Sequence, residues 1–169
     1  MVDLAHLTIE QTWACLQSVP DPEIPVISVT DLGIVRDVSV DGYDAHITVT
    51  PTYSGCPATE MIEQSIREAL MQLGFKNIQI QMQLSPAWTT DWITQDAKER
   101  LRQYGIAPPS GERAHTQEGQ VINFVPYKPA CPRCGSKKTS RLSQFGATAC
   151  KALYRCDSCL EPFEYFKPI

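Results

Sequence analysis

Apolar residues recur at helical spacing in two stretches of the N-terminal half. Ile9, Trp13 and Leu16 share one face, which predicts a short helix over residues 9–18. Thr8 suits its N-cap, and Gln11 three residues later completes a capping box. A longer stripe predicts an amphipathic helix over residues 58–73, made by Ala58, Met61, Ile62, Ile66, Ala69, Leu70 and Leu73.

Alternation of apolar and polar residues predicts three strands. Residues 34–41 and 43–49 flank Asp41-Gly42, a hairpin turn signal, and residues 78–84 alternate Ile, Met and Leu with Gln. His46 falls on the polar face, as a solvated strand residue would. The order helix, hairpin, helix, strand ends in a right-handed β-α-β crossover. We therefore expect a small two-layer α+β sandwich.

A further helix is expected over roughly residues 90–104, with Trp88 and Trp92 anchoring its start. The Pro-rich segment 20–25 ends the first helix and holds Asp21 and Glu23 in an extended loop. That loop fixes the directions of the two acids for a functional site, or is a rigid solvated turn whose acids cap nearby amides.

Composition places the chain among globular proteins. It has 169 residues, of which 43% are hydrophobic and 20% charged, enough to bury a core. No apolar run approaches the roughly 20 residues that a membrane span needs. The N-terminus lacks a basic stretch followed by an apolar run, so no secretory signal is visible. These features predict a cytoplasmic protein without membrane partners.

Charge divides the chain into two modules. Residues 1–125 hold 7 Lys and Arg against 16 Asp and Glu, whereas residues 126–169 hold 8 against 3. We predict an α+β domain over residues 1–104, a linker over residues 105–130 and a basic module over residues 131–169. Residues 121–125 could pair with one of the modules. The acidic body should be repelled by nucleic-acid phosphate, and the basic tail could favour it.

The basic module carries a metal-binding cysteine pattern. Cys131 and Cys134 form one CxxC pair, and Cys156 and Cys159 form another after 21 intervening residues. This spacing predicts a closed tetrahedral four-thiolate site in a zinc-ribbon-like β module. A closed site is structural, and so small a module needs such a metal for stability. Zinc is favoured, with iron in a rubredoxin-like site as the alternative.

Three cysteines lie outside this pattern. Cys15 is predicted to be a partly buried structural thiol, and Cys150 a thiol without metal. The flank of Cys150, residues 145–154, is less polar than a loop should be, which suggests a docking surface. Cys56 is placed at the N-cap of the helix over residues 58–73, with Pro57 at the first helical position.

At that position the helix dipole would stabilise a thiolate on Cys56. Nearby carboxylates of Asp21 and Glu23 would raise its pKa and oppose the dipole, and a bound metal would reverse that effect. The residues alone leave a nucleophilic or metal-binding Cys56 and a merely capping one equally open.

The body resembles the SufT/MIP-type family of iron–sulfur cluster assembly factors. The resemblance rests on three segments within residues 8–104: Asp21-Pro22-Glu23-Ile24-Pro25 running into Thr30-Asp31-Leu32-Gly33, Thr52-Tyr53-Ser54-Gly55-Cys56-Pro57, and Ser85-Pro86-Ala87-Trp88. It implies that Cys56 is the functional thiol, which holds iron or an iron–sulfur cluster transiently. It also implies that Asp21 and Glu23 accompany this thiol.

The whole chain resembles the D-subunit family of bacterial phenylacetyl-CoA epoxidase (ring 1,2-epoxidase) systems. This resemblance rests on residues 51–60, Trp88-Thr89-Thr90-Asp91-Trp92, residues 145–154 and the CxxC pairs. It implies a maturation factor in phenylacetate catabolism rather than an enzyme. The clients would be the reductase with its [2Fe–2S] cluster or the di-iron oxygenase subunit.

One cysteine per chain cannot complete a four-ligand cluster, so a homodimer bridged through two Cys56 thiolates is one possible carrier. A direct component of the epoxidase complex is an alternative, although no di-iron Glu-x-x-His motif or His-containing triad is visible. A zinc-ribbon nucleic-acid binder is the other alternative. It would need stacking by aromatic residues that alternate as strand-core residues would, namely Tyr154, Phe163, Tyr165 and Phe166.

Overall fold

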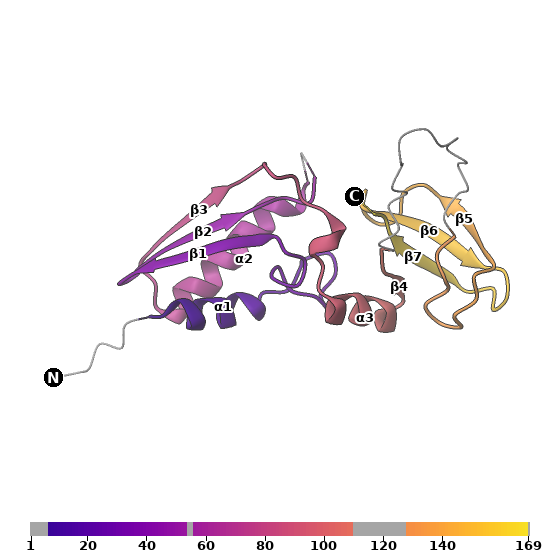
Figure 1. Ribbon diagram of the computed structural model, residues 1–169, viewed down its shortest axis with the longest axis horizontal. Coiled ribbons are helices and arrows are strands. Elements are labelled where there is room, and N and C mark those ends of the chain that lie inside the picture. Colours follow the sequence, from indigo (N-terminus) through magenta and orange to yellow (C-terminus); the bar gives the residue numbers. More distant parts are fainter. Residues whose placement is uncertain (1–6, 54–55, 110–127, 169) are drawn as a thin grey trace, which may run out of the picture. The chain divides into compact units, whose positions relative to one another are not determined.

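The computed structural model describes residues 7–53, 56–109 and 128–168 of the chain. They divide into two compact units, Met1–Ala97 and Lys98–Ile169 (Figure 1). The predicted pairing of residues 121–125 lies outside the described residues. No helix in the described ranges is long and apolar enough to cross a membrane.

The first unit contains a three-stranded sheet in the order β1-β2-β3. Strands β1 (Val35–Asp41) and β2 (Asp44–Val49) form the predicted antiparallel hairpin, and β3 (Asn77–Met82) pairs with β2 in parallel. The parallel pair is what a crossover connection requires. Alternation holds in β2, where Ala45, Ile47 and Val49 are buried and His46 is exposed.

Helices α1 (Ile9–Gln17) and α2 (Ala58–Leu73) cover the buried face of this sheet (Figure 1). The predicted capping box of α1 is present, with Thr8 and Gln11 exchanging hydrogen bonds of 3.2 and 2.9 Å. The buried stripe of α2 is Ala58, Ile62, Ile66 and Leu70, and Gly74 ends the helix at φ 119°. The expected two-layer α+β sandwich is confirmed.

The helix expected over residues 90–104 is two elements. A 3-10 turn, η1 (Thr90–Trp92), is followed by α3 (Gln95–Tyr104). Ile93 between them is extended, with ψ 125°, and is buried. Thr94 then restarts the helix, because its Oγ1 accepts from the amide of Ala97 at 3.1 Å.

The second unit contains a four-stranded sheet in the order β4-β7-β6-β5. Its strands are β4 (Ile106–Ala107), β5 (Thr139–Ser143), β6 (Lys151–Cys156) and β7 (Pro162–Phe166). β5, β6 and β7 are antiparallel neighbours, and β4 joins β7 in parallel. The stretch predicted as linker therefore contains a strand at residues 106–107 that belongs to the ribbon sheet.

Candidate metal centre and carrier thiol

Two tight turns of the ribbon bring four cysteine sulfurs together. All four lie within 4.8 Å of one another, with Cys131 Sγ 3.8 Å from Cys159 Sγ and Cys134 Sγ 3.5 Å from Cys156 Sγ. Sulfurs at the corners of a tetrahedron with metal–sulfur bonds of about 2.3 Å lie about 3.8 Å apart. The thiol set therefore has the dimensions of a closed four-thiolate metal site.

The two turns repeat one hydrogen-bond pattern. The amide of Gly135 donates to Cys131 O at 2.9 Å, and the amide of Leu160 donates to Cys156 O at 3.0 Å. Gly135 has φ 74° and Leu160 has φ 66°. The second turn lacks glycine, yet it keeps the geometry of the first because Leu160 adopts the left-handed conformation at a cost in strain.

Backbone amides donate toward three of the four sulfurs, and at Cys156 their effect prevails. The amides of Cys159 and Ser158 donate to Cys156 Sγ at 3.5 and 3.4 Å, and these bonds lower the pKa of Cys156 to about 6. An amide at Glu161 acts in the same direction on Cys159. There, burial and the neighbouring thiols outweigh it and raise the pKa to about 12. The amides of Ser158 and Cys159 thus favour the thiolate form of Cys156, which is the form that binds a metal.

Cys15 and Cys150 lie apart from this cluster. Cys15 Sγ donates to Ala69 O of α2 at 3.5 Å, and burial raises the pKa of this thiol. Both features fit the predicted structural role. Cys150 Sγ lies 2.9 Å from Thr148 Oγ1, in the loop between β5 and β6.

Cys56 lies in the connection from β2 to α2 and is partly exposed. The prediction that it caps the helix is wrong: the N-cap is Pro57, which makes no side-chain cap bond. Cys56 is instead held by its backbone, with its amide donating to Tyr53 O and its carbonyl accepting from Thr59, both at 3.2 Å. Pro57 itself has helical φ and ψ and precedes Ala58, the first residue of α2.

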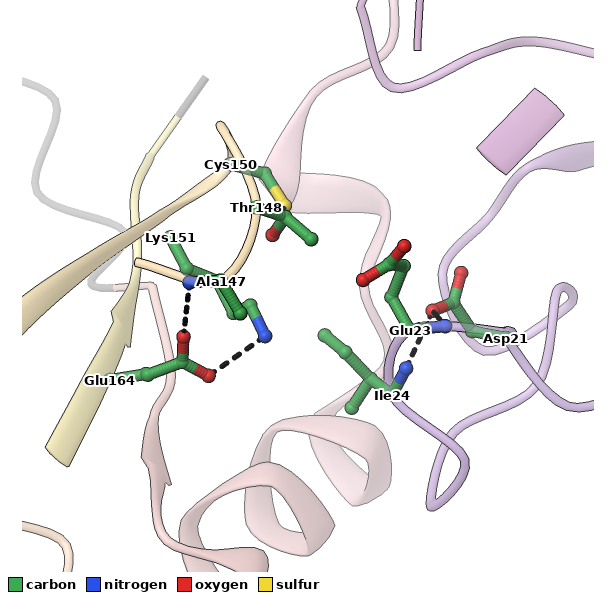
Figure 2. A network of polar contacts seen from close by, with 8 residues as sticks. All are labelled: Asp21, Glu23, Ile24, Ala147, Thr148, Cys150, Lys151 and Glu164. Atoms are coloured by element: carbon green, nitrogen blue, oxygen red, sulfur yellow. Dashed lines mark hydrogen bonds and ion pairs between the residues drawn. The ribbon is translucent and has the colours of Figure 1, made fainter. Parts of the chain in front are cut away.

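The carboxylate of Asp21 makes hydrogen bonds within its own loop. Its Oδ1 accepts from the amides of Glu23 and Ile24 at 2.9 and 2.8 Å, as Figure 2 shows, and the residue is buried. Glu23 is exposed. In the described ranges, the four ribbon cysteines are the one set of three or more acidic, thiol or imidazole side chains at metal-ligand distance. Cys56, Asp21 and Glu23 do not form such a set, so a joint role for them stays a prediction.

Two of the quoted motifs meet in the structure, and sequence reasoning missed that contact. Trp88 Nε1 donates to Leu32 O at 2.8 Å in the buried interior. Gly33 has φ 69°, and a Cβ there would lie 2.7 Å from Trp92 Cβ. A buried hydrogen bond therefore joins the Thr30–Gly33 segment to the Ser85–Trp88 segment.

A second polar network, also missed, fixes the loop between β5 and β6. Glu164 of β7 accepts from the amide of Ala147 and from Lys151 Nζ, both at 2.8 Å (Figure 2). Gly146 fits here because a Cβ would lie 2.6 Å from Glu164 Oε1. The only signal in the sequence was a charged residue between the core positions Phe163 and Tyr165 of the expected strand.

Comparison with known proteins finds one matching family in the N-terminal half of the chain and another in the C-terminal part. Residues 9–79 match the family described as "Iron-sulfur cluster assembly protein", and residues 117–167 match the "PaaD zinc beta ribbon domain". A relative from Escherichia coli (strain K12), named as the D subunit of a "Putative 1,2-phenylacetyl-CoA epoxidase", is 53% identical over 169 residues, which cover 100% of this chain and 98% of the relative. The chain belongs to this D-subunit family.

The N-terminal part of this D-subunit family member is also similar to shorter proteins. An "Fe-S protein maturation auxiliary factor" from Porphyromonas gingivalis is 37% identical over 97 residues, which cover 56% of this chain and 90% of the relative. The crystal structure titled as a domain of unknown function, DUF59, from Bacillus anthracis is 29% identical, with a TM-score of 0.51, and the match covers 54% of this chain and 89% of that one. The name of the Porphyromonas gingivalis relative agrees with the expectation of a non-catalytic protein. The ribbon match and the four sulfurs together indicate a structural metal site.

Proposed function

We propose that this chain is an accessory maturation factor of the phenylacetyl-CoA epoxidase system. It assists assembly of an iron–sulfur or di-iron centre in the reductase or oxygenase subunit and takes no part in turnover. One observation carries the proposal: a chain similar over its full length to an epoxidase D subunit has the iron–sulfur assembly family in its first half.

Cys56 is the residue proposed to carry the cargo, iron or an iron–sulfur cluster. Its backbone is fixed by two hydrogen bonds at the entrance to α2, and its side chain is partly exposed. A lone thiolate supplies one of the four ligands that a cluster needs. Such a site suits transfer, because the remaining ligands come from another molecule and leave with it.

Asp21 and Glu23 are proposed to support this site indirectly. Asp21 shapes the turn that contains Glu23, through hydrogen bonds to two amides. The exposed Glu23 carboxylate is then available to a cation or to the partner. Its loss should weaken cargo transfer less than the loss of Cys56.

Zinc is the metal proposed for the four-cysteine site, in a structural role. Cys131, Cys134, Cys156 and Cys159 would hold it with no open coordination position. The description of the matching ribbon family supports zinc over iron. In this arrangement the ribbon is a stable platform rather than a second carrier.

A homodimer is the proposed form of the loaded carrier. Two Cys56 thiolates, one from each copy, would bridge a single cluster. Native mass measurement under anaerobic conditions tests this: a loaded dimer is expected, and cluster bound to monomer alone would contradict the proposal.

The test of function measures iron and sulfide in the epoxidase reductase and oxygenase subunits. They are purified from cells that lack this chain, carry it unchanged, or carry Cys56→Ala. We expect iron-depleted clients in the first and third strains. Cys15→Ala is the matched control, since its thiol bonds to Ala69 inside the same unit and should leave the clients loaded. Clients fully loaded in all strains would contradict a maturation role.

A direct role in the epoxidase complex is the second candidate, because the full-length relative is named as a subunit. Steady-state epoxidation with fully metallated reductase and oxygenase separates the two. Turnover that depends on this chain would favour the subunit role, and turnover without it would favour maturation.

A further inference from the structure

A groove with a volume of about 550 Å³ opens on the ribbon sheet. Its lining comes entirely from residues 128–168 and includes three cations, two aromatic rings and one acid: Lys128, Arg141, Lys167, Tyr154, Tyr165 and Asp157. The metal site and Cys56 lie outside this lining. The proposed function therefore does not account for this groove.

The groove has an excess of positive charge. In the described part of the chain, Lys128 and Arg141 have no acidic partner at ion-pair distance and are exposed. Lys167 Nζ donates to Gln144 O at 3.2 Å and lies 4.6 Å from the Phe145 ring, contacts that leave its charge uncompensated. Three cations from three separate segments thus face one groove.

The one acid of the lining is already engaged. Asp157 Oδ1 accepts from Ser140 Oγ at 2.9 Å and lies 3.9 Å from a guanidinium nitrogen of Arg155. It therefore offsets little of the field of the three cations. A ligand with several carboxylates would complement this groove, and Arg141 could bind one of them in bidentate fashion.

The tyrosines make a rigid floor rather than a stacking platform. Tyr154 and Tyr165 are 7% and 4% exposed and meet edge to face, with centroids 5.8 Å apart. Nucleic-acid bases need open ring faces, which these buried residues do not offer.

We propose that this groove binds an acidic segment of a partner protein, with Lys128, Arg141 and Lys167 matching its carboxylates. Naming that partner as the client of maturation rests on the proposed function, whereas the preference for an acidic segment does not. The ribbon would then hold the client while another part of the chain delivers the cargo.

The test is calorimetric titration of the full, metal-loaded chain with purified epoxidase reductase and, separately, oxygenase subunit, at low and at raised salt. The variant is Lys128→Glu with Arg141→Glu. The matched control is Arg133→Glu with Lys137→Glu, an equal charge change at exposed ribbon positions outside the groove. Metal content is measured in each.

We expect the groove variant to weaken binding of one subunit by at least about tenfold and the control by much less. Raised salt should weaken the unchanged chain and have little further effect on the groove variant. Equal losses in both variants, or no binding of either subunit by the unchanged chain, would overturn the proposal. So would a single-stranded RNA probe whose binding needs Lys128 and Arg141 while subunit binding does not.

Cys56→Ala separates this inference from the proposed function. It should bind the client as tightly as the unchanged chain while failing to load it. Full loading by Cys56→Ala, with binding still lost in the groove variant, would refute the carrier function and keep the groove. If Cys56→Ala fails to load the client and the groove variant still binds it normally, the carrier function is kept and the groove proposal is refuted.

Discussion

At the scale of single residues, Leu160 is a strained position that can be relieved. Its φ of 66° costs an L-residue about 1–2 kcal/mol, and glycine would lose about 0.5–1 kcal/mol of backbone entropy instead. The side chain is 68% exposed, so little packing is lost. We expect Leu160→Gly to tighten metal binding several-fold in competition with a chelator.

The matched control for this change is Gly135→Ala in the other turn. Gly135 has φ 74°, and nothing lies within 4 Å of a Cβ placed there, so strain alone would be added. We expect Gly135→Ala to weaken metal binding by a similar factor. Weaker binding in Leu160→Gly would show that strain at the second turn does not limit the site.

Gly33 tests the contact between the two motif segments. A Cβ at this position would lie 2.7 Å from Trp92 Cβ, and φ is 69°. Both residues are half-buried, and relieving so short a contact requires a shift of Trp92 or of the backbone, which costs about 1–3 kcal/mol, with backbone strain in addition. We expect Gly33→Ala to lower the free energy of unfolding of the first unit by about 2–4 kcal/mol in urea.

Gly42→Ala is the comparison for Gly33, because it has φ 58° and nothing within 4 Å of its Cβ. It should cost only the strain, about 1 kcal/mol. Equal effects of the two variants would mean that Trp92 moves aside without cost. The Thr30–Gly33 motif would then need another explanation.

At the scale of elements, the sequence predicted those helices whose signals are local. It did not predict the strand that depends on pairing with a distant segment. The capping box of α1 and the stripe of α2 depend on residues three and four apart, so the sequence displays them. Strand β4 has two residues and exists because it pairs with β7, nearly sixty positions away, which no periodicity reveals. The break between η1 and α3 had a visible signal in Thr94, which the continuous apolar spacing around it obscured.

The residues of the candidate sites also divide into those that local spacing predicted and those that it did not. The CxxC spacing predicted the four-sulfur cluster, because each pair forms a local turn and the intervening hairpin joins the two. The helix-capping role given to Cys56 was wrong by one residue, since propensity does not decide where Pro57 stands in the first turn. The three groove cations come from three segments, and only the fold brings them together.

Glu164 fixes the loop between β5 and β6 and can be tested as an element-level contact. Glu164→Ala removes the acceptor of the Ala147 amide and the partner of Lys151. A hydrogen bond to a charged group contributes about 1.5–3 kcal/mol, so hydrogen exchange at Ala147 should quicken by at least about tenfold. Glu161→Ala, at an exposed position without such contacts of its carboxylate among the described residues, should leave that rate unchanged. Unchanged exchange at Ala147 in Glu164→Ala would mean that the loop between β5 and β6 is ordered without its contacts to Glu164.

At the scale of the whole molecule, the two units should differ in their need for metal. The ribbon core is a small cluster in which two of the seven buried residues are themselves proposed metal ligands: Ala107, Cys131, Ala152, Tyr154, Cys156, Phe163 and Tyr165. The first unit buries its own core between a sheet and two helices and contains no member of the four-cysteine set. Structural zinc contributes on the order of 10 kcal/mol to such a small fold.

Removal of the metal with a chelator should therefore unfold the ribbon and spare the sandwich. Amide exchange is the measurement: protection in β5, β6 and β7 should be lost, while protection in β1, β2 and β3 should remain. Cys134→Ser should reproduce this without chelator, because three thiolates and a hydroxyl bind zinc far more weakly. Loss of protection in both units together would show that the chain folds as one cooperative body, and the metal would then stabilise the carrier thiol's scaffold as well as the ribbon.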